Sequence, residues 1–261
     1  MSKLSAVVCV HNEERRLGAC LQRLDFADEV VVVLDRCTDR SRHIAEQYGA
    51  VLVSGAFPLE GARRAAGMAA AGGDWIIEID ADETVGRDLA EEIRAAIQTT
   101  SFGWMRVPVD NYVGDRLIRY GWGGSFGTTL AARLYRRGIK RWGGERVHPK
   151  VVFDDTEGPK LKGALRHQFG EDVSDVLKRL DRYTDLRAQD LLEHGGKLDN
   201  ARRGIQRFWK CYVRRSGWRE GGWGLLLSLM AGLYPLLSVL RAELDSPSVA
   251  EAVPLIHVRA A

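Results

Sequence analysis

The 261-residue sequence predicts an α/β protein in which a mostly parallel sheet is flanked by helices and a helical C-terminal extension follows. Short apolar runs rich in β-branched residues, such as 4–10 and 30–34, stop at polar residues before they reach helical length and are typical of buried strands. Helical patterns separate these runs. Such alternation favours a parallel sheet with helices on both faces.

The elements are justified in chain order by these patterns. We expect the first four strands at 4–10, 30–34, 51–54 and 75–79, and helices at 14–24, 60–71 and 86–97. Thr38 or Asp39 can cap a further helix that Gly49 ends. Strands at 102–109 and 128–135 have no helix between them, which adds mixed or antiparallel pairing. The apolar stripe of 173–192 predicts a long helix.

Three regions follow from this order: a catalytic domain over 1–170, a helical extension over 171–245 and a loose tail over 246–261. A formal net charge of +3 is too small to indicate a nucleic-acid partner. Four cysteines without CxxC spacing indicate reduced thiols. The start of the chain turns polar too soon for a signal peptide, so we expect a cytoplasmic location.

Carboxylates gather where predicted strands end, which is where ligands bind in such sheets. The fourth strand runs into Asp80 and Asp82. Alternation along an extended segment would point both side chains the same way, and two adjacent carboxylates suit Mg²⁺ or Mn²⁺. The alternative is that acidic residues open a helix, which we prefer for Glu83 and Asp88.

The order of several motifs carries a family resemblance. VVCVHNEE, VVVLDRCTDRS and GARRAAGMAAAGGDWIIEIDADE together resemble the opening half of the family 2 glycosyltransferases, which have the GT-A fold and an aspartate–any–aspartate metal motif. The later segments ERVHPK, LKGALRHQF and RRSGWREGGWG are similar to the small lipopolysaccharide core β-glucosyltransferases. The resemblance implies a nucleotide-sugar donor and a divalent metal.

The resemblance also implies roles for individual residues. Asp82 would bind the metal, His167 would complete the metal and diphosphate site, and Asp80 would hold the ribose or a metal-bound water. Arg63 would contact the diphosphate. The remaining substrate-binding residues would surround the nucleoside: Val10, His11, Asn12, Glu13 and Asp35. The loop after Asp35 is shorter than in much of the family, which leaves the role of Asp35 open.

The implied reaction is an inverting transfer of a hexose, from a UDP-glucose-like donor to a lipopolysaccharide core or related surface glycan. A base must take the acceptor proton. Glu145 is the first candidate and Asp110 the second, although Glu145 can equally be a solvated partner of Arg146 or Lys150. The alternatives are a polyprenyl-phosphate acceptor and a non-catalytic module that binds a nucleotide sugar or glycan.

Residues 223–240 carry no charge and lie between basic residues. The segment is short for a membrane span and contains Pro235. A core helix, an interfacial helix and a single span are all compatible with it. Nearby arginines and tryptophans favour peripheral attachment to the anionic inner face of the cytoplasmic membrane, beside a lipid-linked acceptor.

Overall fold

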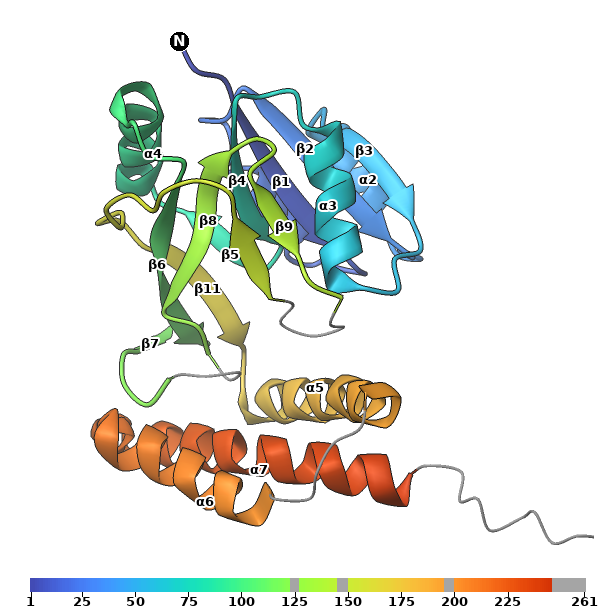
Figure 1. Cartoon of the computed structure of the whole chain (residues 1–261), viewed down its shortest axis with the longest axis vertical. Coiled ribbons are helices and arrows are strands. Elements are labelled where there is room, and N and C mark those ends of the chain that lie inside the picture. Colours follow the sequence, from blue (N-terminus) through green and yellow to red (C-terminus); the bar gives the residue numbers. More distant parts are fainter. Residues whose placement is uncertain (123–126, 145–149, 195–199, 246–261) are drawn as a thin grey trace, which may run out of the picture.

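A mixed sheet organises the described part of the chain, which in this computed structural model comprises residues 1–122, 127–144, 150–194 and 200–245 (Figure 1). Its strand order is β3-β2-β1-β4-β8-β6-β11-β5, with β7 paired to β6. The parallel strands are β1 (Leu4–Val10), β2 (Glu29–Asp35), β3 (Val51–Gly55) and β4 (Trp75–Asp80).

The second half of the sheet is mixed, as the sequence predicts. β8 lies antiparallel to both β4 and β6, whereas β11 runs parallel to β6. These strands and the short ones beside them are β5 (Glu83–Val85), β6 (Trp104–Val113), β7 (Arg116–Ile118), β8 (Leu130–Arg136) and β11 (Leu165–Gly170). A separate hairpin consists of β9 (Lys140–Trp142) and β10 (Val151–Phe153).

Helices cover both faces of the sheet, because each buried strand is apolar on both sides. One core contains inward residues of α1 (Leu17–Leu21), α2 (Ser41–Gln47) and α4 (Arg87–Thr99). On the other face α3 (Glu60–Ala70) packs so closely that a Cβ at Gly67 would lie 2.6 Å from side chains of β1 and β2. The predicted α/β class is confirmed.

Several predicted boundaries change. The helix expected at 14–24 is helical only over α1, and β6 extends to Val113. The interpretation of Glu83 as a helix-opening residue is wrong, because Glu83 begins strand β5 and pairs with β11. Asp88 does lie in the first turn of α4. Glu83 pairs with His167, 84 residues further along the chain, and local sequence does not specify such a distant partner.

The extension consists of helices that pack beneath the sheet (Figure 1). They are α5 (Val173–His194), α6 (Asn200–Trp209), a π-helical turn (Lys210–Arg214), a 3₁₀ turn (Gly217–Glu220) and α7 (Gly222–Leu244). Their core also includes Val113, Ile118, Trp122 and Phe169 from the sheet and its loops. The extension therefore shares its hydrophobic core with the end of the sheet, and the division at residue 170 stays a prediction.

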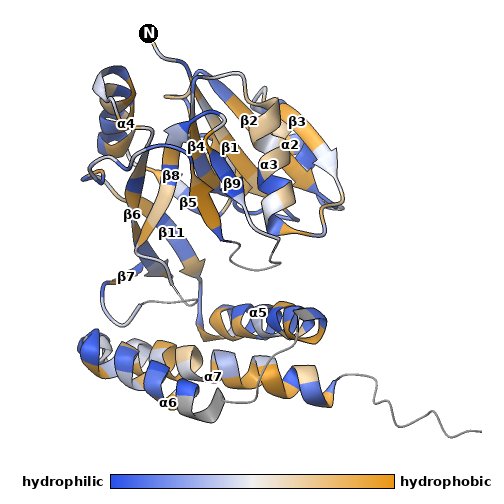
Figure 2. Ribbon diagram, in the orientation of Figure 1, coloured by the Kyte–Doolittle hydropathy of each residue, from blue (hydrophilic) through white to orange (hydrophobic). Residues whose placement is uncertain are grey.

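Helix α7 holds the apolar segment expected from the sequence and is the most apolar helix of the extension in Figure 2. Pro235 lies inside it and does not end it. Among the described residues, α7 alone is long and apolar enough to cross a membrane by length and composition, and 50% of its apolar window is buried within the protein.

Candidate active site at the ends of the strands

Asp80 is the last residue of β4, and both of its carboxylate oxygens accept hydrogen bonds from arginines. Oδ1 lies 3.0 Å from Arg64 Nη2 of α3, and Oδ2 accepts from Arg133 Nη2 of β8. The strand ends here and a turn follows, so the expectation that alternation aligns Asp80 with Asp82 is wrong. Each aspartate has its own set of cationic partners.

Asp82 lies in that turn and faces β11 and α5. Its Oδ2 atom is 3.4 Å from His167 Nε2 and accepts a hydrogen bond from Arg179 Nη2 at 2.8 Å. The side chains of Asp82, His167 and Arg179 are each only 14–15% exposed. The structure therefore brings together Asp82 and His167, two residues that the family resemblance pairs.

The orientation of the His167 ring follows from Asn111 of β6. Asn111 Nδ2 donates to the Thr128 carbonyl, so its Oδ1 accepts from His167 Nδ1 at 2.6 Å. In the neutral ring this leaves a lone pair on Nε2, aimed at the Asp82 carboxylate. In that neutral form two acceptors face one another, and either a second proton on the ring or a metal cation between Nε2 and Asp82 resolves the conflict.

These donors fit a divalent metal. Asp82 supplies a hard oxygen ligand, His167 an imidazole nitrogen, and Asn111 the outer hydrogen bond that commonly fixes a ligating histidine. Within the described ranges no three His, Cys, Asp or Glu side chains cluster as a complete metal cage. Mg²⁺ and Mn²⁺ do not need one, since water and phosphate oxygens complete their coordination.

The electrostatics separate the carboxylates of this site. Burial alone would raise the pKa of Asp82, but His167 and Arg179 outweigh it and hold that pKa below its ordinary value. Burial would likewise raise the pKa of Asp80. The charges of Arg133 and Arg64 outweigh burial and hold that pKa well below its ordinary value.

Glu83 behaves oppositely. It is 2% exposed, and burial together with the Asp80 charge raises its pKa to about 7, although Arg133 Nη2 donates to it at 2.8 Å. One guanidinium serves both Asp80 and Glu83. Of the two carboxyl groups, Glu83 is the one that takes up a proton as pH falls toward its raised pKa, which reduces the negative charge buried at this edge.

The ends of β1 and β2 form the neighbouring wall. His11 Nδ1 lies 2.7 Å from the Asp35 carbonyl. Asn12 adopts a positive φ of 56°, and its Oδ1 accepts from the Thr38 amide at 2.8 Å, so it ties the two loops together. Val10 is fully buried in the core, so its side chain faces away from any ligand.

The Asp35 carboxylate is engaged by its own surroundings. It accepts from Arg36 at 2.8 Å and from the Phe57 amide at 3.0 Å, and Arg63 Nη1 lies 3.7 Å away. Arg63 therefore pairs with Asp35 in this structure. The Glu13 side chain is 28% exposed. Burial, and to a lesser extent the negative charge of Asp82, raise the pKa of Glu13, so Glu13 lies close to Asp82.

The two candidate bases have different outcomes. Glu145 lies outside the described residues; the strands that flank it are joined where the Gly143 amide donates to the Lys150 carbonyl at 2.7 Å. Asp110 pairs in register with Arg166, while the next residue, Asn111, pairs with His167. Alternation puts Asp110 on the opposite face from His167, so the geometry gives no support to Asp110 as the base.

Three site arginines were not predicted: Arg64, Arg133 and Arg179. Arg179 had a usable signal, because it lies three residues after Val176 on the apolar stripe of α5, where a charge needs a buried partner. Arg64 lies beside the predicted Arg63 and also pairs with Glu60 one turn earlier. Arg133 gave no local signal beyond its position in a basic region.

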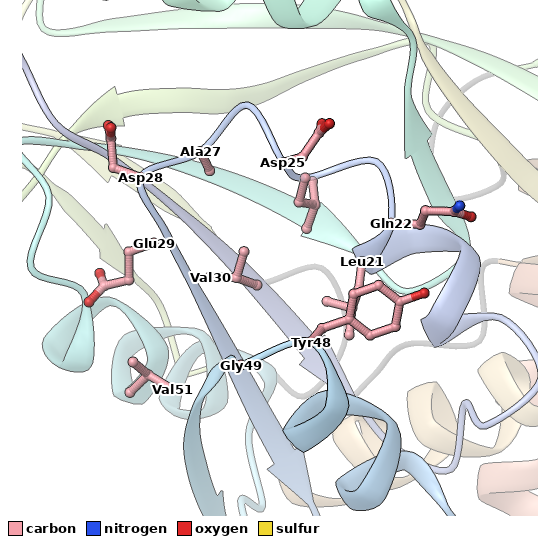
Figure 3. Close-up of a pocket in the computed structure, with 11 residues that line it drawn as sticks. Leu21, Gln22, Asp25, Ala27, Asp28, Glu29, Val30, Tyr48, Gly49 and Val51 are labelled. Atoms are coloured by element: carbon pink, nitrogen blue, oxygen red, sulfur yellow. The ribbon is translucent and has the colours of Figure 1, made fainter.

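Two cavities lie elsewhere among the described residues. One of about 480 Å³ opens between the amino ends of β2 and β3, beside Leu21, Tyr48 and Val51 (Figure 3). Another of about 460 Å³ lies beside the stacked rings of Trp104 and Phe153 and is also lined by Arg106 and Glu157. Neither is lined by Asp80 or Asp82, so neither is assigned to the candidate site.

The motif order and the clustered aspartates can now be compared with known proteins. The family described as "Glycosyl transferase family 2" matches residues 5–148, more than half of the chain. The chain belongs to this family. The match covers β1 to β9 and thus every strand end that forms the site except that of β11.

Curated relatives of this family 2 chain are also glycosyltransferases. It is 25% identical over 227 residues to the uncharacterized glycosyltransferase RP128 of Rickettsia prowazekii, covering 82% of this chain and 76% of that protein. It is 25% identical over 263 residues to the lipopolysaccharide core biosynthesis glycosyltransferase LpsC of Rhizobium meliloti, covering 90% of each. The predicted family is thus confirmed, and the chain is an enzyme of the transferase class.

Solved structures show more distant likeness. Glucosyl-3-phosphoglycerate synthase from Mycobacterium tuberculosis, in complex with Mn²⁺, uridine diphosphate and glucosyl-3-phosphoglycerate, is 18% identical with a TM-score of 0.46, covering 76% of this chain and 82% of that one. TarS of S. aureus is 15% identical with a TM-score of 0.48, covering 84% of this chain and 46% of that one.

Proposed function

We propose that this family 2 enzyme is an inverting glycosyltransferase that moves a hexose from a nucleotide diphosphate sugar, UDP-glucose or a close analogue, to a lipopolysaccharide core or related surface glycan. The observation that carries the proposal is the convergence of Asp82 and His167, with the second ring nitrogen of His167 fixed by Asn111. The name of the relative LpsC supports the acceptor class.

Several side chains have proposed roles in donor binding. The backbone of Val10 and the loop residues His11, Asn12 and Glu13 surround the base, and Asp35 approaches the nucleoside. Mg²⁺ or Mn²⁺, held by Asp82 and His167, would supply charge neutralisation for the departing diphosphate. Arg63 contacts that diphosphate by leaving its long 3.7 Å pairing with Asp35. Asp80 orients the ribose or a water, with Arg64 and Arg133 fixing its carboxylate.

The transfer itself is a single displacement. Glu145 takes the proton of the acceptor hydroxyl, whose oxygen attacks the anomeric carbon from the face opposite the diphosphate. The new bond to the acceptor oxygen forms as the bond to the diphosphate oxygen breaks, and the electron pair leaves with the diphosphate. One such displacement inverts the configuration at the anomeric carbon.

Replacement of Asp82 tests this proposal. Asp82→Asn keeps the shape of the side chain but removes its charge, and we expect about a 100- to 1,000-fold loss of Mn²⁺-dependent sugar transfer. Asp115→Asn is the matched control, because Asp115 is fully exposed in a loop. Transfer at the wild-type rate by Asp82→Asn would refute the assignment.

Two alternative functions predict other results. A non-catalytic binding module would bind UDP and release no product from any donor. A polyprenyl-phosphate transferase would transfer sugar to a lipid phosphate in preference to a glycan. Parallel assays with both acceptor types, using the wild-type protein, distinguish the three functions.

We also infer a peripheral membrane location at the inner face of the cytoplasmic membrane, supported by one surface of the α6–α7 pair. Three leucines four residues apart on α7 are 41–45% exposed: Leu225, Leu229 and Leu233. On α6, Ile205 is 72% and Trp209 58% exposed. We call these five residues the apolar face.

The two stripes lie on the same side of the helix pair. The antiparallel helices meet at Gly204 and Gly232, where a Cβ at Gly204 would be 2.7 Å from the Gly232 carbonyl. Ile205 directly follows Gly204 on α6, and Leu233 directly follows Gly232 on α7. Because the two helices run antiparallel, a step of one residue turns both side chains to the same side of the pair. Exposed basic residues on this hairpin suit anionic headgroups: Arg203, Lys210, Arg214 and Arg219.

Vesicle binding tests this location. Leu229→Glu should abolish co-sedimentation with vesicles containing anionic phospholipid, because it places a charge in the centre of the apolar face. Val51→Glu, at a similarly exposed position (43%) on β3, is the matched control and should bind as wild type. Equal sedimentation of both variants would refute attachment through this face.

A further inference from the structure

Arg179 is the residue through which the helical extension reaches the candidate active site. It belongs to α5, its guanidinium lies 4.7 Å from the centre of the Phe169 ring, and its Nη2 donates to Asp82. Its neighbours Val176 and Leu180 are buried. The side chain is thus held in place by packing as well as by the ion pair.

Arg179 and a metal ion require the same atom. Asp82 Oδ2 accepts from Arg179 at 2.8 Å, and the same Oδ2 is the oxygen that faces His167 Nε2 at 3.4 Å. A divalent cation between Asp82 and His167 would lie directly beside the guanidinium. Two positive groups so close in a largely buried site repel strongly, so the arrangement seen here excludes simultaneous occupancy.

We propose that Arg179 is an exchangeable counter-cation: it neutralises Asp82 while the donor site is empty, and it moves to the diphosphate when metal and nucleotide bind together. This inference rests on the proposed function, since it assumes a nucleotide diphosphate ligand. The planar guanidinium is well suited to phosphate oxygens. Arg182, one turn further along α5, adds positive charge near Glu13.

In the proposed exchange Asp82 and Arg179 each have a partner of opposite charge both before and after the ligands bind. Before binding, Asp82 is paired with Arg179. After binding, Asp82 faces the metal, the metal faces the diphosphate, and Arg179 gains the diphosphate as its partner. Metal without nucleotide would instead leave Arg179, whose side chain is 15% exposed, without its hydrogen-bonded carboxylate and with only the weaker interaction with Glu13, which is costly. Metal and nucleotide should therefore bind with positive coupling, and reciprocally so.

The coupling is measurable without turnover. Mn²⁺ binding to the full chain is followed by the loss of the EPR signal of free Mn²⁺, with and without UDP. For the wild type we expect UDP to tighten Mn²⁺ binding about 10-fold or more. For Arg179→Gln we expect Mn²⁺ alone to bind about 10-fold tighter than to wild type, because its competitor is gone, and UDP to tighten it much less.

Lys178→Gln is the matched control. Lys178 precedes Arg179 on α5, has a side chain that is 77% exposed and lies 3.5 Å from Asp175, so its removal should leave both Mn²⁺ affinities at wild-type values. Circular dichroism melts establish that each variant is folded. If Arg179→Gln does not fold, Arg179→Met, which keeps the length of the side chain and removes its charge, takes its place in the same titrations.

The outcomes separate this inference from the proposed function. Wild-type protein that binds Mn²⁺ equally well with and without UDP overturns the exchange, as does an Arg179→Gln variant whose affinity for Mn²⁺ alone is unchanged or weaker. Wild-type protein that binds neither UDP nor Mn²⁺ under any condition overturns the proposed function as well.

Discussion

The buried pair of Lys140 and Glu78 allows a sharp test of how this site is held. Lys140 Nζ lies 2.6 Å from Glu78 Oε2, and the two side chains are 4% and 3% exposed. In Lys140→Met the Glu78 carboxylate would keep only the Tyr135 hydroxyl at 2.7 Å and Arg64 Nη1 at 3.7 Å among its present partners. A buried charge would be left poorly compensated.

The expected loss follows from that geometry. Removing one partner of a buried ion pair costs about 3–5 kcal/mol, and Arg64 keeps the loss near the lower end, at about 3 kcal/mol. The effect depends on pH. Burial opposes, but Lys140 and Arg64 outweigh it and hold the pKa of Glu78 below its ordinary value, so its stabilisation is present at neutral pH and is lost as pH falls. The difference between variant and wild type should therefore shrink in acid.

Urea denaturation at pH 8 and at pH 3.5, the latter below the ordinary glutamate pKa of 4.5, measures both quantities by circular dichroism. The double variant Glu78→Gln/Lys140→Met should recover much of the loss, because no unpaired charge remains. Lys160→Met, at an exposed position, is the control. A loss under about 1 kcal/mol at pH 8 for Lys140→Met, or a double variant less stable than the sum of the single losses, would refute the reasoning.

Three other predictions concern stability and metal binding. Because the pKa of Glu83 is raised from 4.5 to about 7, the free energy of unfolding falls as pH rises between those values, by on the order of 3 kcal/mol; Glu83→Gln should remove this pH-dependent loss in urea titrations. Gly67→Ala should lower the free energy of unfolding by about 1–3 kcal/mol, since its Cβ would lie 2.6 Å from two valine side chains; Gly86→Ala, where the space is open, should not show this overpacking loss. Asn111→Leu should weaken Mn²⁺ binding in the presence of UDP about 10- to 100-fold, because the His167 ring loses its orienting partner, and an unchanged EPR titration would contradict that role.

Local patterns in the sequence predicted most of the sheet. β1 occupies the predicted 4–10, β3 and β4 are each one residue longer than predicted at the C-terminal end, and β2 is one residue longer at both ends. These strands are buried on both faces, so each is a continuous apolar run that ends where polar loops begin. Strands β5, β7 and β11 of the sheet were missed, as was the β9–β10 hairpin. All except β11 have three residues, which carry too little pattern, and β5 and β11 pair with partners that are distant in sequence.

The site was predictable in its anionic half and not in its cationic half. Asp80 and Asp82 follow the fourth strand, so their position at the sheet edge was readable from the chain. Their partners Arg133 and Arg179 come from positions 53 and 97 residues away. Of the 38 lysines and arginines, Arg179 alone among these partners had a local signal, as a charge on the apolar stripe of its helix, and that signal does not specify Asp82 as its partner.

The sequence by itself determined the family, the parallel half of the sheet and the edge at which the carboxylates gather, because hydrophobic period and motif order are properties of neighbouring residues. Only the tertiary structure decided which atoms meet. It turned Asp82 toward His167 and Arg179, placed Asp110 on the other face and left the apolar face of α6 and α7 exposed. The physical reason is that charge pairing and burial depend on distances across the fold, which residue spacing along the chain does not specify.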